Sequence, residues 1–541
     1  MYNKIMIKSK LTEDLRQILK QLNLDDAKLE VIVAPKPELG DYSTNIALQQ
    51  SNQSSDASRQ SVDEIAKKIL SHLSNLSYLS DFGITNGFIN FFIKKELLAS
   101  DLSEILEKKA NFGRSEYGKG QKIQVEFVSA NPTGPLTLPN GRSASIGDAL
   151  ARVLEFAGYL VEREYYVNDT GNQIRRLGDS IKAVGGQIPS SPDHYQGDYV
   201  KELAEKFKTN LELDSLELGH LAADYFLDNE IKPALDRMGV KFDSFFSERS
   251  LYEGGLVLSA LENLKQKSLT YEKDGAVWLK SSDWGDDEDR VILTSVGVRG
   301  KSEPTYIMPD IAHYLESFKS GITKKINILG ADHHSYGKRL QAALKALNLA
   351  DHSQIIFIQM VTLRRGGQAV RMSKRAGDFV TLDELLDEVS PDVVRWFMLM
   401  YSPDSHINFD LDLAKQQSQK NPVFYVQYAY ARMSSILDKS GELAGLGKLE
   451  QLINPAEQNL IKQLLELPEL IEKLSKDYQV HHLTAYAIKL ADNFHRFYET
   501  ERVLNAETPE LTQARVELIK ASQIVLGNTL KLLGVTAPER M

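Results

Sequence analysis

The chain has 541 residues, 42% of them hydrophobic, so it is long enough for two to four domains with substantial cores. It contains no cysteine, which excludes disulfide bonds and zinc sites built on thiolates. Its net charge of −10 argues against indiscriminate nucleic-acid binding, so RNA would have to meet local basic patches. We see neither a signal peptide nor a run of about 20 apolar residues, and therefore expect a cytoplasmic protein without membrane contact.

Residues 1–108 form the first predicted unit, which mixes helices and strands. Leu15–Leu22 has a helical pattern, whereas Val31–Val33 and Ile84–Ile93 are strand-like. Between them, Gln49–Ser61 is rich in Ser, Gln and Asn, a composition that predicts a loop or a helix edge. The pattern alone leaves open a purely structural α/β module.

Residues 125–166 predict a strand, a Gly/Pro-rich corner and a long helix. Val125–Val128 is strand-like, residues 132–141 carry the strand-breaking glycines and prolines, and Ile146–Ala157 has helical spacing. A helix that begins after such a corner points free N–H groups and its positive dipole end at a ligand above the sheet. The segment therefore suits a nucleotide phosphate, although an ordinary strand-to-helix connection has the same form.

The remaining chain divides into an alternating region and a helical one. Residues 109–395 alternate between strand and helix patterns, as in a doubly wound parallel sheet, with one expected insertion at about 172–290. A buried strand is predicted to end at Gly330, and ligands bind at such strand ends. From residue 396 to 541 apolar residues recur at helical spacing, which predicts a helical bundle.

Motifs along most of the chain resemble, in the same order, those of bacterial arginyl-tRNA synthetases, which are class I enzymes. The likeness is carried by SANPTGPL at 129–136, VNDTGNQI at 167–174, GDYSTN at 40–45, GFINFF at 87–92, PTYIMPDIAHYL at 304–315, LGADHH at 329–334, VRMSKRAGDFVTLDELLDEV at 370–389 and APERM at 537–541.

The resemblance implies a fold and a function for each part of the chain. The fold is α/β: a class I Rossmann-type catalytic domain at 109–395, an N-terminal α/β tRNA-binding domain at 1–108, and a C-terminal α-helical anticodon-binding domain at 396–541. The implied reaction joins L-arginine to tRNA(Arg), with ATP as a substrate. Mg²⁺ would arrive with ATP, held mainly by phosphate oxygens, and no zinc is expected. The family is typically monomeric and is known for activating arginine only with tRNA bound.

The class I histidine motif is altered in this chain. The family usually has His-Val-Gly-His after the leucine, whereas this chain has Thr137, Leu138, Pro139 and Asn140. The resemblance makes Thr137 and Asn140 the catalytic donors to the ATP phosphates, as in bacterial tryptophanyl enzymes, which carry Thr-Ile-Gly-Asn there. Pro139 and Gly141 are expected to contact ATP. A proline ring adds bulk and removes an N–H, so we expect weaker or shifted ATP binding.

The segment RMSKR resembles the class I Lys-Met-Ser-Lys-Ser loop, with Arg371 in place of the first lysine. The resemblance makes Lys374 catalytic and places Met372 and Ser373 at ATP. A loop that carries Lys374 could close on the pyrophosphate and stabilise the charge that develops there. By composition alone, the segment would be a solvated basic turn.

Recognition of arginine is expected to use carboxylates, because a guanidinium is planar, always charged and well matched to them. In the family, Tyr306 and Asp310 contact the arginine side chain, and Glu126 and Asn131 contact its amino group. A single carboxylate near a strand end is more often a cap or an ion-pair partner. The combination of the four residues points to arginine.

The sequence GADHH supplies the last catalytic-domain candidates. The resemblance places Asp332 at the ATP ribose and His333 or His334 at adenylate or arginine. Adjacent histidines usually point in different directions, so we assign no metal site to them.

For tRNA, the resemblance selects Asn45 in the first domain and Tyr425, Tyr428 and Arg432 in the last. Exposed tyrosines could stack on unpaired bases, although aromatic residues at helical spacing usually belong to a core.

Two alternatives stay open at this point. One is a relative that has lost catalysis and still binds tRNA, which only the altered corner at 137–140 suggests. The other is a different class I adenylate-forming ligase, which Tyr306, Asp310 and the terminal APERM disfavour.

Overall fold

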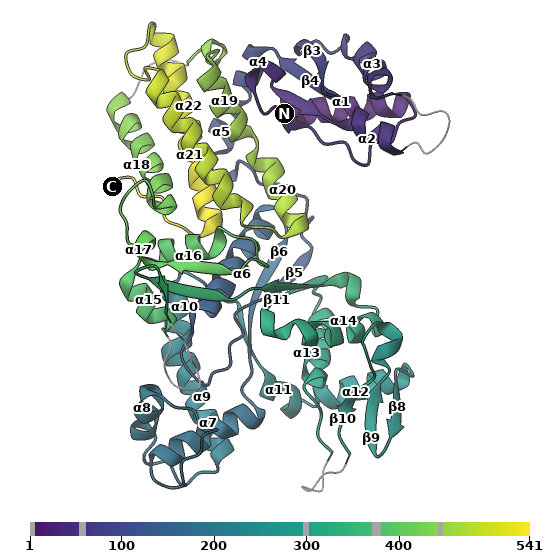
Figure 1. Cartoon of the computed structure of the whole chain (residues 1–541), viewed down its shortest axis with the longest axis vertical. Coiled ribbons are helices and arrows are strands. Elements are labelled where there is room, and N and C mark those ends of the chain that lie inside the picture. Colours follow the sequence, from purple (N-terminus) through teal and green to yellow (C-terminus); the bar gives the residue numbers. More distant parts are fainter. Residues whose placement is uncertain (1–5, 54–60, 296–301, 371–379, 442–446) are drawn as a thin grey trace.

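The computed structural model describes residues 6–53, 61–295, 302–370, 380–441 and 447–541. Three parts follow one another along the chain: a small α/β unit, a central part built on a parallel sheet, and a bundle of long helices (Figure 1). This order confirms the fold class predicted from the sequence. Among the described residues, no helix is both long and apolar enough to cross a membrane.

The N-terminal unit is an antiparallel sheet with the strand order β1-β2-β4-β3, packed with helices. The prediction of one strand over Ile84–Ile93 is wrong, because the chain turns at Asn86 and Gly87, which have φ values of 52° and 80°. An Asn-Gly pair suits the left-handed backbone of a tight hairpin turn. The elements are α1 (Ile7–Gln21), β1 (Ile32–Val33), β2 (Tyr42–Thr44), α2 (Ile46–Gln53), α3 (Val62–Leu73), β3 (Leu79–Thr85) and β4 (Phe88–Ile93).

The central part is built on a five-stranded parallel sheet with the order β12-β11-β5-β6-β7. The chain runs outward from β5 in both directions, so the strand order reverses beside β5, where ligands bind in open α/β sheets. The strands are β5 (Lys122–Glu126), β6 (Leu160–Val167), β7 (Ser244–Ser247), β11 (Lys324–Gly330) and β12 (Ser353–Ile358); the helices that bear on the site are α6 (Leu138–Phe156), α13 (Ile307–Lys319) and α14 (His334–Ala346).

The segment expected as one insertion, residues 172–290, contains β7 of the central sheet and is therefore split by it. Helices precede β7, and two helices with a small antiparallel sheet of order β10-β9-β8 follow it. These elements are α7 (Gly171–Val184), α8 (Asp198–Lys206), α9 (Ser215–Phe226), α10 (Lys232–Arg237), α11 (Glu248–Glu253), α12 (Leu256–Gln266), β8 (Thr270–Lys273), β9 (Ala276–Leu279) and β10 (Arg290–Leu293).

A second small sheet, of order β14-β13-β15, leads from the central part into the helical bundle. It comprises β13 (Val361–Arg365), β14 (Gln368–Ala369) and β15 (Ile407–Asp410), accompanied by α15 (Leu382–Glu388), α16 (Pro391–Leu399) and α17 (Leu411–Ala414). The bundle, as predicted, consists of helices: α18 (Pro422–Ser440), α19 (Pro455–Leu465), α20 (Leu467–Asp477), α21 (His482–Thr500) and α22 (Pro509–Leu533).

The N-terminal unit lies against α19 and α20 of the bundle, joined to the central part by α4 (Lys95–Ser100) and α5 (Leu102–Lys108) (Figure 1). Two ion pairs cross this junction. Lys8 pairs with Glu469, and Lys462 Nζ lies 3.2 Å from an Asp41 carboxylate oxygen. Asp41 belongs to the GDYSTN motif, so this motif helps to hold the unit on the bundle.

Candidate active site

A cavity of about 1500 Å³ opens at the carboxyl ends of the central strands. Its wall includes Glu126 at the end of β5, Tyr166 on β6, Gly330 on β11 and Ile358 on β12. Single-ligand pockets usually hold about 300–1,000 Å³. A cavity of this size at the point where the strand order reverses can hold more than one substrate.

The corner at 137–140 lies at the start of α6, on the cavity wall. Asn140 Oδ1 accepts hydrogen bonds from the backbone N–H of Thr137 and from Thr137 Oγ1, each at 2.9 Å. Because the backbone N–H can only donate, the orientation of the Asn140 amide is fixed. Asn140 Nδ2 has no hydrogen-bond partner within the described part of the chain, so this group, more than the Thr137 hydroxyl, is free to donate to a ligand.

Pro139 and Gly141 follow in the first turn of α6 but have different surroundings. Pro139 lines the cavity, and a proline is tolerated there because the first N–H groups of a helix lack intrahelical partners. Gly141 is buried, and a Cβ atom at this position would lie 2.9 Å from Leu382 Cδ1. The glycine therefore allows α6 to pack closely against α15. Unlike Pro139, Gly141 does not line the cavity.

The GADHH segment lies between β11 and α14 and also borders the cavity. Asp332 and His333 line the cavity, and the Asp332 side chain is 80% exposed. His334 instead stacks on Phe357, with ring centroids 4.0 Å apart, so the two histidines diverge as expected. Sequence reasoning missed Arg339 on α14, which also lines the cavity and whose buried Nε has no hydrogen-bond partner among the described residues.

One end of the cavity is strongly acidic. Glu126, Glu248 and Asp310 all line it. Burial raises the pKa of Asp310 well above its ordinary value, and the neighbouring carboxylates Glu126 and Glu248 raise it further. Burial also raises the pKa of Glu248, to about 7. Carboxyl groups gathered in this way favour a cationic ligand.

The other residues predicted for arginine lie on the same wall. Tyr306 precedes α13 and Asp310 lies in its first turn, so the pair is one helical turn apart as predicted. Tyr306 is 80% exposed, whereas Asp310 accepts a hydrogen bond from the Tyr336 hydroxyl. Asn131 is exposed in the turn after β5 and also lines the cavity. The structure thus brings the four predicted arginine contacts to one cavity.

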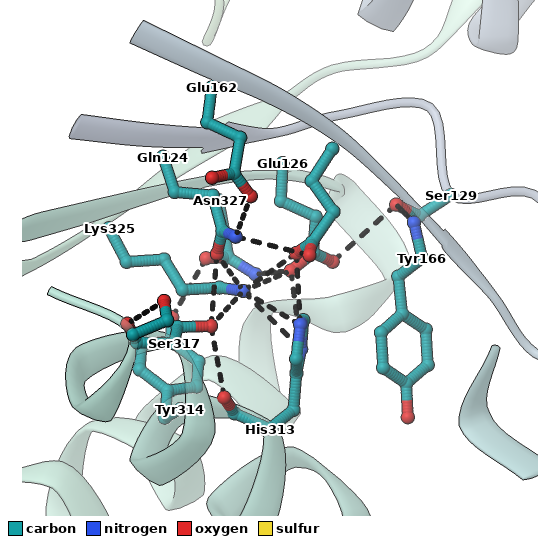
Figure 2. A network of polar contacts seen from close by, with 12 residues as sticks. Gln124, Glu126, Ser129, Glu162, Tyr166, His313, Tyr314, Ser317, Lys325 and Asn327 are labelled. Carbon is teal, nitrogen blue, oxygen red and sulfur yellow. Dashed lines mark hydrogen bonds and ion pairs between the residues drawn. The ribbon is translucent and has the colours of Figure 1, made fainter. Parts of the chain in front are cut away.

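Behind Glu126 lies a buried cluster that resembles a metal site. Ligand atoms of Glu126, Glu164 and His313 lie within 4.8 Å of one another. Lys325 Nζ occupies this cluster, at 3.1 Å from Glu126 Oε2, 3.0 Å from Glu164 Oε1 and 3.2 Å from His313 Nε2 (Figure 2). The cation that balances these carboxylates is therefore an ammonium group of the chain itself.

The predicted catalytic loop residues Lys374, Met372 and Ser373 lie outside the described residues. The chain after the loop is described, and Thr381 forms an antiparallel bridge with Thr137. The backbone N–H of Leu382 also donates to the carbonyl of Leu136, at 2.8 Å. Position 381 is thus held beside the corner at 137–140.

The residues predicted to contact tRNA belong to the first and last parts of the chain and do not line this cavity. Asn45 precedes α2, and its side-chain oxygen accepts a hydrogen bond from Gln49. Tyr425, Tyr428 and Arg432 lie on α18 and are half-buried. Arg432 donates to the Tyr428 hydroxyl at 3.1 Å, and the Tyr425 hydroxyl donates to Asp492 on α21. These three side chains form a polar aromatic patch, partly engaged within the bundle.

Comparison with known families matches three stretches of the chain. Residues 7–93 match the arginyl tRNA synthetase N terminal domain, residues 101–398 the catalytic domain of class I (R) tRNA synthetases, and residues 426–541 the DALR anticodon binding domain. The chain belongs to the arginyl-tRNA synthetase family. It is therefore a class I aminoacyl-tRNA synthetase, and its parallel sheet is the catalytic core of that class.

Individual relatives agree with this family over the whole length of the synthetase. The arginine–tRNA ligase of Geobacter sp. (strain M21) is 42% identical, over 96% of this chain and 96% of its own. That of Thermotoga maritima is 40% identical, over 99% of this chain and 100% of its own. The structure of arginyl-tRNA synthetase from Thermus thermophilus superposes with a TM-score of 0.82 at 25% identity, covering 99% of this chain and 100% of that one.

Proposed function

We propose that this synthetase activates L-arginine with ATP and transfers the arginine to the 3′-terminal ribose of tRNA(Arg). The observation that carries the choice of amino acid is the acidic end of the cavity, where Glu126, Glu248 and Asp310 meet. Arginine has two positive charges, one on its guanidinium and one on its α-ammonium group. The three carboxyl groups can provide a partner for each of them. Membership of the family supports the same substrate.

Within this cavity, the guanidinium would lie between Asp310, Glu248 and the Tyr306 ring. A guanidinium has five donors in a planar fork and pairs best with carboxylates, and its face can also stack on an aromatic ring. The α-ammonium group would then reach Glu126 and Asn131 at the end of β5. This orientation directs the arginine carboxylate toward the phosphate corner at the start of α6.

ATP would occupy the opposite end of the cavity. Asn140 Nδ2 is the free donor for its phosphates, Thr137 holds the Asn140 amide in place, and Pro139 bounds the nucleotide. Asp332 and His333 offer partners to the ribose and the adenylate. The positive dipole end of α6 would favour the phosphates, and Gly141 permits the close packing that positions this helix.

The segment RMSKR would supply the remaining contacts to ATP. Lys374, with Met372 and Ser373, would approach the pyrophosphate, and Thr381, which follows them in the chain, is bridged to Thr137. Mg²⁺ would accompany ATP and be held mainly by phosphate oxygens. Zinc is not required, and the chain has no cysteine to offer it.

The chemistry proceeds in two displacements. An arginine carboxylate oxygen attacks the α-phosphorus of ATP, and the bond to the bridging oxygen breaks, so arginyl-adenylate and pyrophosphate form. A terminal ribose hydroxyl of the tRNA then attacks the arginyl carbonyl carbon and AMP leaves with the bonding pair, while the hydroxyl proton is released. Positioning and charge stabilisation by the protein account for the acceleration.

We further propose that the three domains at 1–108, 109–395 and 396–541 divide the recognition of tRNA(Arg) between them. Asn45 would contact tRNA from the first domain, and Tyr425, Tyr428 and Arg432 would do so from the last, where aromatic rings can stack on bases. The enzyme would act as a cytoplasmic monomer, in keeping with its family.

The substitution Asp310→Asn tests the assignment of the acidic end. It keeps the shape of the side chain and removes the charge, and hydrogen bonds to charged groups contribute about 1.5–3 kcal/mol. We expect the KM for arginine in ATP–pyrophosphate exchange, with tRNA present, to rise roughly tenfold to hundredfold while the KM for ATP changes little. An unchanged KM for arginine would exclude Asp310 from the arginine site.

A further inference from the structure

Three neighbouring strands of the central sheet carry polar side chains on the face that α13 covers. In β11, side chains alternate between the two faces, so Ile326 and Ile328 lie on one face and Lys325 and Asn327 on the other. The strand register extends these polar positions across β5 and β6 in two rows: Lys325, Gln124 and Glu162 in the first, and Asn327, Glu126 and Glu164 in the second.

Lys325 is the centre of this face, and its side chain is 0% exposed (Figure 2). Besides its carboxylate partners, its Nζ donates to Gln124 Oε1 at 2.6 Å and lies 3.3 Å from His313 Nδ1. Strands inside parallel sheets are normally apolar, and a buried ammonium is costly unless it is paired. Lys325 does not line the cavity but lies directly behind Glu126, which does.

The two oxygens of Glu126 have different environments. Oε2 receives the Lys325 ammonium at 3.1 Å and the Asn327 amide at 2.8 Å. The Asn327 amide is itself held by the Tyr314 hydroxyl, at 2.9 Å. Among the described residues, Oε1 accepts only a long hydrogen bond, of 3.4 Å, from Ser129 Oγ. The Lys325 ammonium and the Asn327 amide thus hold the Glu126 carboxylate through Oε2. Oε1 retains lone pairs that can accept hydrogen bonds from a ligand.

We propose that Lys325, together with Asn327, is a positioning residue for the α-ammonium group of arginine. Both residues hold Glu126 Oε2 and thereby present Oε1 to the substrate. The inference rests on the proposed function of Glu126 and extends it to two residues that do not touch arginine. The effect is confined to the α-ammonium end, because Asp310 and Glu248 hold the guanidinium independently.

A different role for Lys325 would be charge balance alone. Burial would raise the pKa of Glu164, but Lys325 and His313 lower it to about 2, so Glu164 is ionised. Lys325 sets one positive charge against the two carboxylates Glu126 and Glu164. The substitution Lys325→Met alone would remove this charge from both buried carboxylates and destabilise the fold. The double variant Lys325→Met/Glu164→Gln restores the net charge and still lacks the ammonium.

The experiment compares arginine with 5-guanidinopentanoate, which lacks only the α-amino group. Dissociation constants for both are measured by calorimetry on the full-length enzyme with tRNA bound, and each variant is checked by its Tm. We expect Lys325→Met/Glu164→Gln to reduce the preference for arginine over the analogue roughly tenfold to hundredfold and to bind the analogue normally. Glu164→Gln is the matched control and should keep the wild-type preference.

A second variant makes the test independent of the buried lysine. Asn327→Ala removes the other donor to Glu126 Oε2 without changing any charge, and it should also lower the preference for arginine. If Glu126→Gln itself keeps the full preference, the proposed function of Glu126 is wrong. If Glu126→Gln loses the preference but Asn327→Ala and the double variant keep it, Lys325 and Asn327 do not position Glu126, and the inference is overturned.

Discussion

The substitution Glu248→Gln should make arginine binding weaker and less dependent on pH. Glu248 begins α11, on the cavity wall near Asp310, and burial raises its pKa to about 7. The substitution keeps the shape and removes one charged partner of the guanidinium, a loss of about 1.5–3 kcal/mol. This corresponds to a roughly tenfold to hundredfold higher dissociation constant for arginine at pH 8.

The pH dependence has a definite sign. A guanidinium binds the ionised carboxylate, so in the unmodified enzyme arginine must displace a proton once the pH falls below about 7. Arginine affinity therefore decreases from pH 8 to pH 6. The same raised pKa means that the free enzyme loses stability as pH rises from the ordinary glutamate value of 4.5 to about 7, and bound arginine offsets this loss.

The assay is calorimetry of arginine binding between pH 6 and pH 8, with tRNA present, on the unmodified enzyme and on Glu248→Gln. Asp310→Asn serves as the comparison variant, because it also removes a carboxyl group from the acidic end but keeps Glu248. Glu248 is excluded as a partner of the guanidinium if Glu248→Gln binds arginine as the unmodified enzyme does at pH 8, or if it keeps the same decrease in affinity toward pH 6.

Three further substitutions test the phosphate end of the cavity. Asn140→Ala should lower kcat for arginine activation roughly 10²–10³-fold with little change in ATP affinity, because it removes a donor to developing charge; full exchange activity would exclude the corner as the phosphate site. Pro139→Gly should keep kcat and lower the KM for ATP, since it restores an N–H and space on the cavity wall, and a higher KM would contradict this. Lys374→Ala should slow adenylate formation roughly 10²–10³-fold in rapid-quench kinetics, and an equal loss of tRNA affinity would indicate an RNA contact instead.

The parts of the site that could be predicted from the sequence depend on how neighbouring elements follow one another along the chain. A strand, a Gly/Pro-rich corner and a helix must place the helix start above the sheet edge, so the position of Asn140 followed from pattern. The spacing of Tyr306 and Asp310 likewise places both at one end of α13. The Asn86–Gly87 hairpin was within reach of the same reasoning, because Asn-Gly between apolar residues is a strong turn signal.

Other features depend on contacts between distant segments. Glu248 follows a short strand inside the charged stretch 172–290, and only its place in the sheet brings it near Asp310. Gly141 lies beside Asn140 in sequence, yet its missing Cβ accommodates Leu382 from another helix. Lys325 did leave a signal, because the alternation of Lys325 and Asn327 with buried isoleucines predicts a polar face. Its partners, however, come from three other elements.

In our proposal, the acidic end of the cavity selects arginine for transfer to tRNA(Arg). The most direct measurement is aminoacylation of tRNA(Arg) by the unmodified enzyme, with arginine and with citrulline, which is nearly isosteric but uncharged at the side-chain end. We predict charging with arginine and a preference over citrulline of at least roughly 10²-fold in kcat/KM, because citrulline leaves buried carboxylates unpaired. Equal use of citrulline, or tRNA binding without any arginine-dependent charging, would contradict the account.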